Sequence, residues 1–304
     1  KPLGLMRAIT DLKLKYSRLN IAEKLIAINV VVFIFVFVLR TVGFLMQAPQ
    51  TPLLDWFAFP KDVDEFIFKP WTLITYAFFH SGLWHILGNM LILFYASQYF
   101  LNYFSPKRLL NYYFLGAICG ALVFMLSYNV FPAFQGQGRS TLIGASAAVM
   151  AVLVGIATHI PHMRIRLMFL GSIKFWWIAA FLVVIDVIQI PLNNPGGHLA
   201  HLGGALLGYI YTKQLAKGND IGSGFEKLAD WVSGLFSKTP REKKSPLKTV
   251  HKTKRSKATT AKKPKKDDQQ KKVDAILDKI SKSGYDSLTK AEKDFLFNAG
   301  KDNI

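Results

Sequence analysis

The chain has 304 residues, of which 51% are hydrophobic, and its mean hydropathy of +0.24 accompanies a formal net charge of +19. A soluble globular domain seldom combines these properties, so that class is excluded, and the charged and apolar residues must occupy separate parts of the chain. The single cysteine, Cys119, excludes an intramolecular disulfide framework.

Lysine and arginine crowd residues 1–24, and six apolar runs of spanning length follow them. These runs cover residues 25–46, 80–103, 109–131, 142–160, 167–190 and 199–216. Basic residues recur after the second run (Lys107, Arg108), after the fourth run (Arg164, Arg166) and throughout the tail. By the positive-inside rule, both termini lie in the cytoplasm. The sequence therefore predicts an all-α, multi-pass integral membrane protein with a six-span domain over residues 25–217.

Four polar residues fall near the starts of spans two, four and six, which all run from the outside inward: His85, Asn89, Ser146 and His201. They therefore share the outer half of the membrane. His85 and Asn89 are four residues apart and lie on one helix face. Polar side chains are costly at this depth and suggest a functional site, although hydrogen bonding between helices is the simpler alternative.

Ser146 lies among small residues in Gly144-Ala145-Ser146-Ala147-Ala148. His201 is followed by Gly204 and Gly208, which give the sixth span a face that another helix can approach closely. Close approach is what a serine nucleophile and a histidine base require, because the two must come within hydrogen-bond reach.

The set Gly144-Ala145-Ser146, Ala200-His201 with Gly204 and Gly208, and His80, His85 and Asn89 resembles the signature of the rhomboid intramembrane serine proteases. The resemblance covers about residues 71–210. It implies a six-helix bundle of a bacterial member in the inner membrane, with a C-terminal cytoplasmic extension. It also implies a serine endopeptidase that needs no cofactor and cleaves transmembrane proteins near the outer membrane boundary.

Within that resemblance each site residue has an implied role. Ser146 is the nucleophile and His201 the general base and acid, forming a dyad that works through an acyl-enzyme. His85, Asn89 and the Ser146 backbone N–H form the oxyanion hole, with His80 as a supporting residue. Thr72, Leu101 and Met150 depart from the family pattern.

Two other classes compete with the protease interpretation: a rhomboid-fold pseudoprotease that binds membrane clients without cutting them, and a transporter, which the lack of paired charges in the spans disfavours. A metal cluster of histidines, including His198, is disfavoured because no acidic residue stands at a metalloprotease spacing. No metal is therefore expected. Asp186, near the outer end of span five, is expected to reach the membrane interface, which leaves a dyad without a carboxylate.

The tail divides into three predicted segments. Residues 218–240 show the helical apolar spacing of a helix that lies along the membrane surface. Residues 241–272 contain fourteen lysines and arginines against three acids, which predicts a disordered linker attracted to the anionic lipids of the inner leaflet. Nucleic acid is not expected, because no aromatic residues interleave the basic ones. Residues 273–304 are expected to form a small helical hairpin, with Gly284 ending one helix and Thr289 and Glu292 capping the next, that docks either a cytoplasmic partner or the membrane domain.

Overall fold

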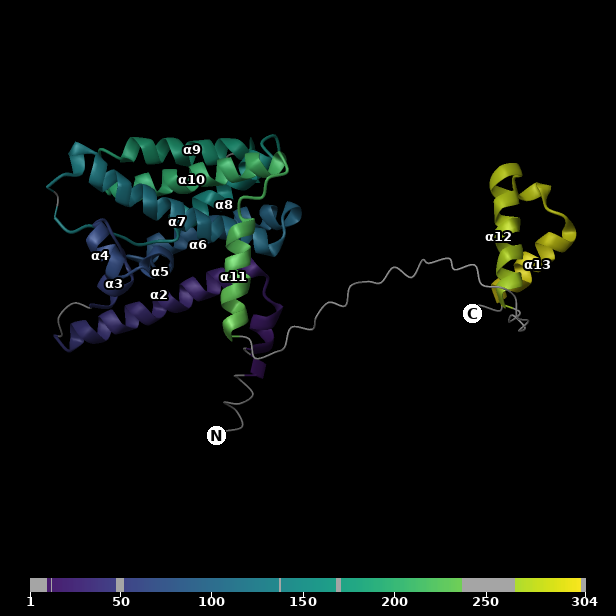
Figure 1. Ribbon diagram of the computed structural model, residues 1–304, viewed down its shortest axis with the longest axis horizontal. Coiled ribbons are helices and arrows are strands. Elements are labelled where there is room, and N and C mark those ends of the chain that lie inside the picture. Colours follow the sequence, from purple (N-terminus) through teal and green to yellow (C-terminus); the bar gives the residue numbers. More distant parts are fainter. Residues whose placement is uncertain are drawn as a thin grey trace, which may run out of the picture. The chain divides into compact units, whose positions relative to one another are not determined.

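The computed structural model describes residues 10–11, 13–47, 52–136, 138–167, 171–236 and 266–301. The chain divides into two compact units, residues 1–239 and 240–304. Helices dominate both units (Figure 1).

Six helices form the body of the first unit, and each corresponds to one predicted span: α2 (Ile21–Leu45), α6 (Leu83–Tyr103), α7 (Pro106–Val130), α8 (Ser146–His159), α9 (Phe175–Gln189) and α10 (Pro195–Ala216). α8 occupies the middle of the bundle, where it packs against α6, α7, α9 and α10. Most of its residues are buried, and they include Val149, Val152 and Ile156, which are almost wholly inaccessible to solvent.

Local sequence signals account for the helix starts. Asn20 and Glu23 form a reciprocal capping box at α2, in which each side chain accepts a hydrogen bond from the other residue's backbone N–H. Ser105 caps α7 and Asn194 caps α10, and in both helices proline follows as the first helical residue.

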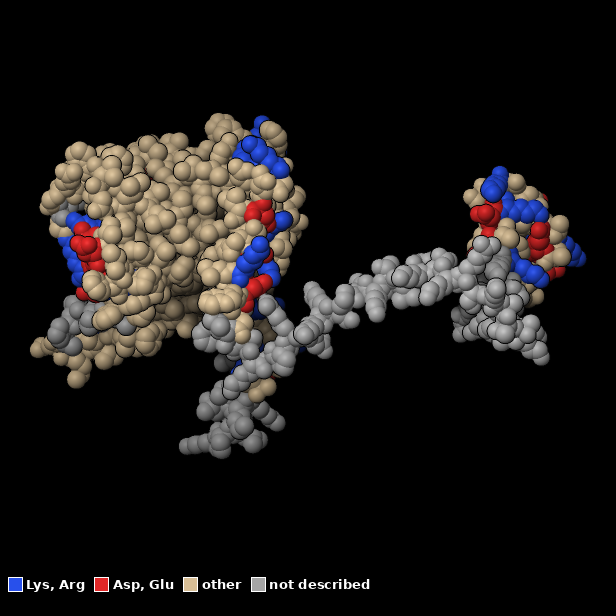
Figure 2. Space-filling model, viewed as in Figure 1, with Lys and Arg blue, Asp and Glu red and all other residues tan. Residues whose placement is uncertain are grey.

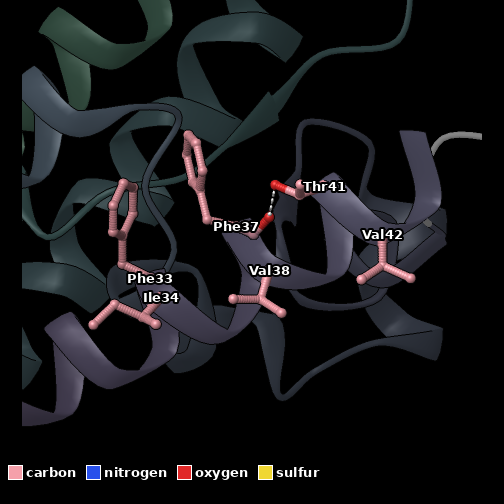
Figure 3. A pocket seen from close by; sticks show the side chains of 6 residues that line it. All are labelled: Phe33, Ile34, Phe37, Val38, Thr41 and Val42. Atoms are coloured by element: carbon pink, nitrogen blue, oxygen red, sulfur yellow. Dashed lines mark hydrogen bonds between the residues drawn. The ribbon is translucent and has the colours of Figure 1, made fainter. Parts of the chain in front are cut away.

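The first unit has the surface of a membrane protein. α2 and α7 are each long and apolar enough to cross a bilayer, and the bent pair of Thr72–Phe78 with α6 makes a third candidate span. α8 and α9 are apolar but shorter. On the face drawn in Figure 2, charged residues of this unit gather toward the two ends and leave an uncharged band between them. An apolar groove on α2 also belongs to this surface (Figure 3), and Thr41 within it donates its hydroxyl proton to the Phe37 carbonyl at 2.9 Å.

Three predicted spans begin before their helices do. The run 167–190 is helical only from Phe175, because Arg164–Leu167 (β3) and Gly171–Lys174 (β4) pair as an antiparallel ribbon. The run 142–160 becomes helical only at Ser146. The run 80–103 begins its long helix at Leu83, after a 98° bend from the preceding Thr72–Phe78 segment. In each case apolar loop or strand residues extend the hydrophobic run beyond the helix, so composition alone did not locate the boundary.

The segment between α2 and α6 folds over one end of the bundle as short elements: α3 (Pro52–Phe57), β1 (Phe59–Pro60), α4 (Val63–Phe68), α5 (Thr72–Thr75) and the 3-10 turn Tyr76–Phe78. β1 pairs with β2 (Thr141–Leu142), which immediately precedes α8. Arg139 strengthens this junction through ion pairs to Asp55 (3.1 Å) and Glu65 (2.8 Å). The strand that leads into α8 is thereby tied to the loop that leads into α6.

At the other end, α11 (Ser223–Phe236) packs against α7. Asn111 donates a hydrogen bond to Glu226 at 2.8 Å, and the rings of Phe114 and Phe225 are 5.9 Å apart. Trp231 and Leu228 remain exposed on α11. An amphipathic helix is therefore present within the predicted 218–240 segment.

The second unit contains α12 (Lys266–Ser283), the 3-10 turn Tyr285–Ser287 and α13 (Lys290–Lys301). The predicted helix stop at Gly284 is confirmed, with φ +78°, and so is the capping box, in which the Thr289 N–H donates to Glu292 at 2.8 Å. α12 begins before the predicted boundary at residue 273. The remainder of the predicted linker, residues 241–265, lies outside the described residues.

Candidate active site

Ser146 stands at the first residue of α8, and its position is set by the residues before it. Gly144 has φ +125°, a conformation that side-chain-bearing residues rarely adopt, and its N–H donates to the Tyr76 carbonyl at 3.0 Å. The Tyr76 hydroxyl in turn donates to the Ala117 carbonyl of α7 at 2.7 Å. These hydrogen bonds fix the turn that precedes Ser146. Ser146 therefore lies at the N-terminus of a buried helix, where the first backbone N–H groups have no partner within the helix.

The glycines of α10 bring that helix against the start of α8. Gly204 lies against the backbone of Ala147, and Gly208 lies against the backbone of Ala151, one turn further along. This register means that α8 and α10 run parallel. His201, one turn before Gly204, is therefore level with the start of α8, where Ser146 lies.

His85 lies beside Ser146 from the α6 side. A Cβ placed on Gly144 would be 2.8 Å from His85 Nε2 and 3.6 Å from Ser146 Oγ. The other ring nitrogen, Nδ1, accepts a hydrogen bond from the Ser81 backbone N–H at 3.4 Å and lies 3.0 Å from the Ser81 hydroxyl. Because a backbone N–H can only donate, Nδ1 of the neutral ring is unprotonated and Nε2 carries the proton. His85 thus presents an N–H donor next to the serine hydroxyl.

Asn89 and His80 lie on either side of His85. Asn89 is buried, and one hydrogen of its side-chain amide bonds to the His85 carbonyl at 2.9 Å, which leaves the second hydrogen available. His80 is 2% exposed, and its ring meets that of His85 at 5.0 Å with an interplanar angle of 66°. Within the described part of the chain, neither ring nitrogen of His80 has a hydrogen-bond partner.

The residue that sequence reasoning placed wrongly is Asp186. Instead of reaching the membrane interface, its side chain on α9 is 6% exposed, and Oδ1 lies 2.7 Å from His201 Nδ1 and 2.8 Å from His198 Nδ1. Its signal in the sequence was that it is the only charged residue of an otherwise apolar helix. The spacing of a single helix could not show which neighbouring helix the carboxylate faces.

The hydroxyl and the imidazole of the predicted dyad are not joined in this structure. Across the residues that the structure describes, His201 is hydrogen-bonded through Nδ1 to Asp186, and no hydrogen bond links its Nε2 to Ser146 Oγ. Such bonds are often long in a free enzyme and shorten when substrate binds. The site therefore has a serine at a helix N-terminus, an N–H donor at His85 and an imidazole at His201 that is hydrogen-bonded to a carboxylate.

An apolar cavity of about 500 Å³ opens between α6, α8 and α9. Tyr95 and Tyr99 line it from α6, and Phe175 and Leu182 line it from α9. The rings of Tyr99 and Phe175 are 5.4 Å apart across it. The cavity is large enough to admit apolar side chains from a partner lying between these two helices.

A bundle of apolar helices that brings a serine and histidines together places the protein in the class of polytopic membrane proteins with a polar site between their helices. Comparison with known proteins identifies the family within that class: residues 68–218 match the Rhomboid domain, and the chain belongs to the rhomboid family. This confirms the resemblance found in the sequence. Residues 263–298 match a second family, whose function is unknown.

Three relatives show how far the similarity extends. The chain is 32% identical over 158 residues to RHOMBOID-like protein 12, mitochondrial, of Arabidopsis thaliana. That alignment covers 48% of this chain and 47% of the plant protein. It is 29% identical over 181 residues to the presenilin-associated rhomboid-like protein, mitochondrial, of Bos taurus. That alignment covers 59% of this chain and 45% of the bovine protein. With the Homo sapiens protein of the same name the identity is 31% over 147 residues, and the alignment covers 47% of this chain and 37% of the human protein. The chain thus spans less than half the length of each relative.

Proposed function

We propose that this protein is an intramembrane serine endopeptidase that cleaves transmembrane proteins near the outer membrane boundary. The observation that carries the proposal is the register of α8 and α10, which sets His201 level with Ser146, while His85 presents a donor from α6. Rhomboid family membership supports the same activity.

The reaction begins when Ser146 Oγ attacks the carbonyl carbon of the scissile peptide and passes its proton to His201 Nε2. The negative charge that develops on the carbonyl oxygen is stabilised by the His85 Nε2–H, the Asn89 amide and the Ser146 N–H at the positive end of α8. The C–N bond then breaks, and His201 returns the proton to the leaving amine. Water attacks the acyl-enzyme with His201 again as base, which releases the carboxyl product and restores Ser146.

The length of α8 supports cleavage below the membrane surface. With 14 residues at about 1.5 Å each, α8 extends for about 21 Å, less than the roughly 30 Å hydrocarbon core. If the C-terminus of α8 lies at the cytoplasmic boundary, as the neighbouring basic residues suggest, its N-terminus falls within the membrane thickness, where non-helical backbone is tolerated only beside protein or a hydrated cavity. A transmembrane substrate must unwind at Ser146 before it is cut, because helical backbone shields its own peptide bonds.

The proposed location is a bacterial inner membrane, with both termini in the cytoplasm. The charges that support this orientation are Lys107 and Arg108 at the start of α7, Arg164 and Arg166 in β3, and the basic tail, which also attracts anionic lipids. Residues 273–304 are proposed to bind a cytoplasmic partner. Their deletion should leave cleavage of a purified substrate intact while removing a co-purifying protein.

The test is cleavage of a single-span substrate by the full-length protein reconstituted in vesicles. The wild type should produce two fragments, and Ser146→Ala and His201→Ala, each assayed as folded protein, should produce none. Folded wild-type protein that binds a range of single-span proteins without cutting any of them would instead establish a pseudoprotease.

A further inference from the structure

The strongest unassigned feature of the molecule is the buried carboxylate of Asp186. It stands on α9, which has no other charged residue, and the two histidines that contact it both come from α10. Within the described residues, no lysine or arginine pairs with Asp186. A buried carboxylate is costly unless it is hydrogen-bonded, so the two imidazole N–H groups are what stabilise it.

The hydrogen-bond pattern fixes the state of both rings. An ionised carboxylate can only accept, so a neutral histidine facing it must carry its proton on Nδ1. At 2.7 Å from Asp186 Oδ1, His201 is therefore held with its proton on Nδ1 and the Nε2 lone pair exposed. That lone pair is the acceptor that a general base needs for the serine proton.

The same three side chains form a geometric candidate for a metal site, since their ligand atoms lie within 4.8 Å of one another. The contacts argue against this assignment. Two ligands on one tetrahedral zinc, each about 2.0–2.2 Å from the ion, stand roughly 3.3 Å apart. The two nitrogens lie 2.7 and 2.8 Å from the same carboxylate oxygen, which is hydrogen-bond spacing.

We propose that Asp186 is a positioning residue for His201, and that His198 holds Asp186 in place by sharing Oδ1. The site is then a serine–histidine–aspartate arrangement contributed by three helices: Ser146 by α8, His201 by α10 and Asp186 by α9. Asp186 sets the tautomer and orientation of His201 and stabilises the imidazolium that forms when Ser146 gives up its proton. The carboxylate does not touch the substrate. This inference rests on the proposed protease function.

The arrangement makes the helix α9 part of the catalytic geometry. The cavity that α9 lines through Phe175, Ile178 and Leu182 lies nearer the other end of this helix, so it is separate from the Asp186 contact.

The kinetic test uses Asp186→Asn in the full-length protein, with Thr212→Val as the matched control. Thr212 is a buried polar residue on α10 that bonds to the Gly155 carbonyl and the Tyr112 hydroxyl, away from the site. Asp186→Asn should lower kcat about 10²- to 10⁴-fold with KM unchanged, because the amide can donate to His201 and favour the wrong tautomer. Asp186→Glu should recover part of the loss. Thr212→Val should lower the unfolding temperature without lowering kcat of the folded fraction.

The second readout is the tautomer of His201, measured by ¹⁵N NMR of histidine-labelled protein and assigned by comparison with His201→Gln. The proposal requires the proton on Nδ1 in the wild type and a shift toward Nε2 in Asp186→Asn. Because this measurement also works in Ser146→Ala, it remains valid if the wild type proves to be proteolytically inactive. An inactive wild type would overturn the proposed function, but the ¹⁵N measurement would still show whether Asp186 sets the tautomer of His201.

Three outcomes would overturn the proposal. One is an Nε2-protonated His201 in the wild type, and another is a folded Asp186→Asn protein with wild-type kcat. The third is a metal response with two parts: a chelator activates the wild type, and zinc inhibits the wild type but neither Asp186→Asn nor His198→Gln. That result would make Asp186, His198 and His201 a metal site.

Discussion

Gly204→Ala tests whether the contact between α8 and α10 sets the catalytic geometry. A Cβ at this position would lie 2.9 Å from the Ala147 Cα, 2.7 Å from its carbonyl carbon and closer still to its oxygen, whereas ordinary contact begins near 3.4 Å. The obstructing atoms are backbone and cannot rotate away. The two helices must therefore separate locally by at least 0.7 Å, which is 3.4 Å less 2.7 Å.

That separation acts on residues adjacent to the chemistry, because Ala147 follows Ser146 and Gly204 is one turn from His201. Overpacking of this kind costs about 1–3 kcal/mol of stability, and a misplacement of about 1 Å can cost roughly 10²-fold in rate. We therefore expect Gly204→Ala to cleave substrate at least tenfold more slowly, with a lower unfolding temperature. The assay is cleavage of the single-span substrate, normalised to folded protein.

Gly88→Ala is the matched control, since a Cβ on this glycine of α6 would have no atom within 4 Å. It should leave the rate unchanged and stabilise α6 by about 0.5–1 kcal/mol. If Gly204→Ala retained wild-type rate and stability, the close approach of α8 and α10 would have no role in holding the site.

Two further predictions concern the oxyanion donor and the outer loop. His85→Ala should lower kcat about 10²- to 10³-fold with little change in KM, measured by steady-state cleavage, because it removes a donor aimed at the developing charge; an unchanged kcat would remove His85 from the mechanism. Although burial by itself raises the pKa of Glu65, hydrogen bonds from Lys69 and Arg139 outweigh it and hold that pKa below the usual value of 4.5. The stabilisation is therefore complete above pH 4.5 and is lost as the pH falls through the folded-state value. The free energies of unfolding of the wild type and Glu65→Gln should differ by about 1 kcal/mol or less near neutral pH, because the group is partly exposed, and should converge in acid; a difference that persists at low pH would contradict this.

The sequence was sufficient to single out Ser146 and His201 as candidates. Ser146 and His201 stand out because each is a polar residue in an apolar run, and the glycines after His201 indicate a close helix contact that the structure contains. The positions and order of the long helices in the described part of the first unit followed from hydrophobic run length and from the basic residues between runs.

Other features depended on contacts between distant segments. The rotation of α9 about its axis decides whether Asp186 faces lipid or His201, and a helix that is apolar on all sides carries no periodic signal of that rotation. Arg139 pairs with Asp55 and Glu65 across more than seventy residues of sequence, which no local pattern reports. The β3–β4 ribbon was missed because its apolar residues adjoin those of α9.

The central claim is that Ser146 is a nucleophile activated by His201. The most direct test treats detergent-solubilised protein with a fluorophosphonate, digests it and locates the adduct by mass spectrometry. The account predicts an adduct on the peptide that contains Ser146 in the wild type and none there in folded His201→Ala. Folded wild-type protein that carries no adduct, or carries it on a different serine, would contradict the account.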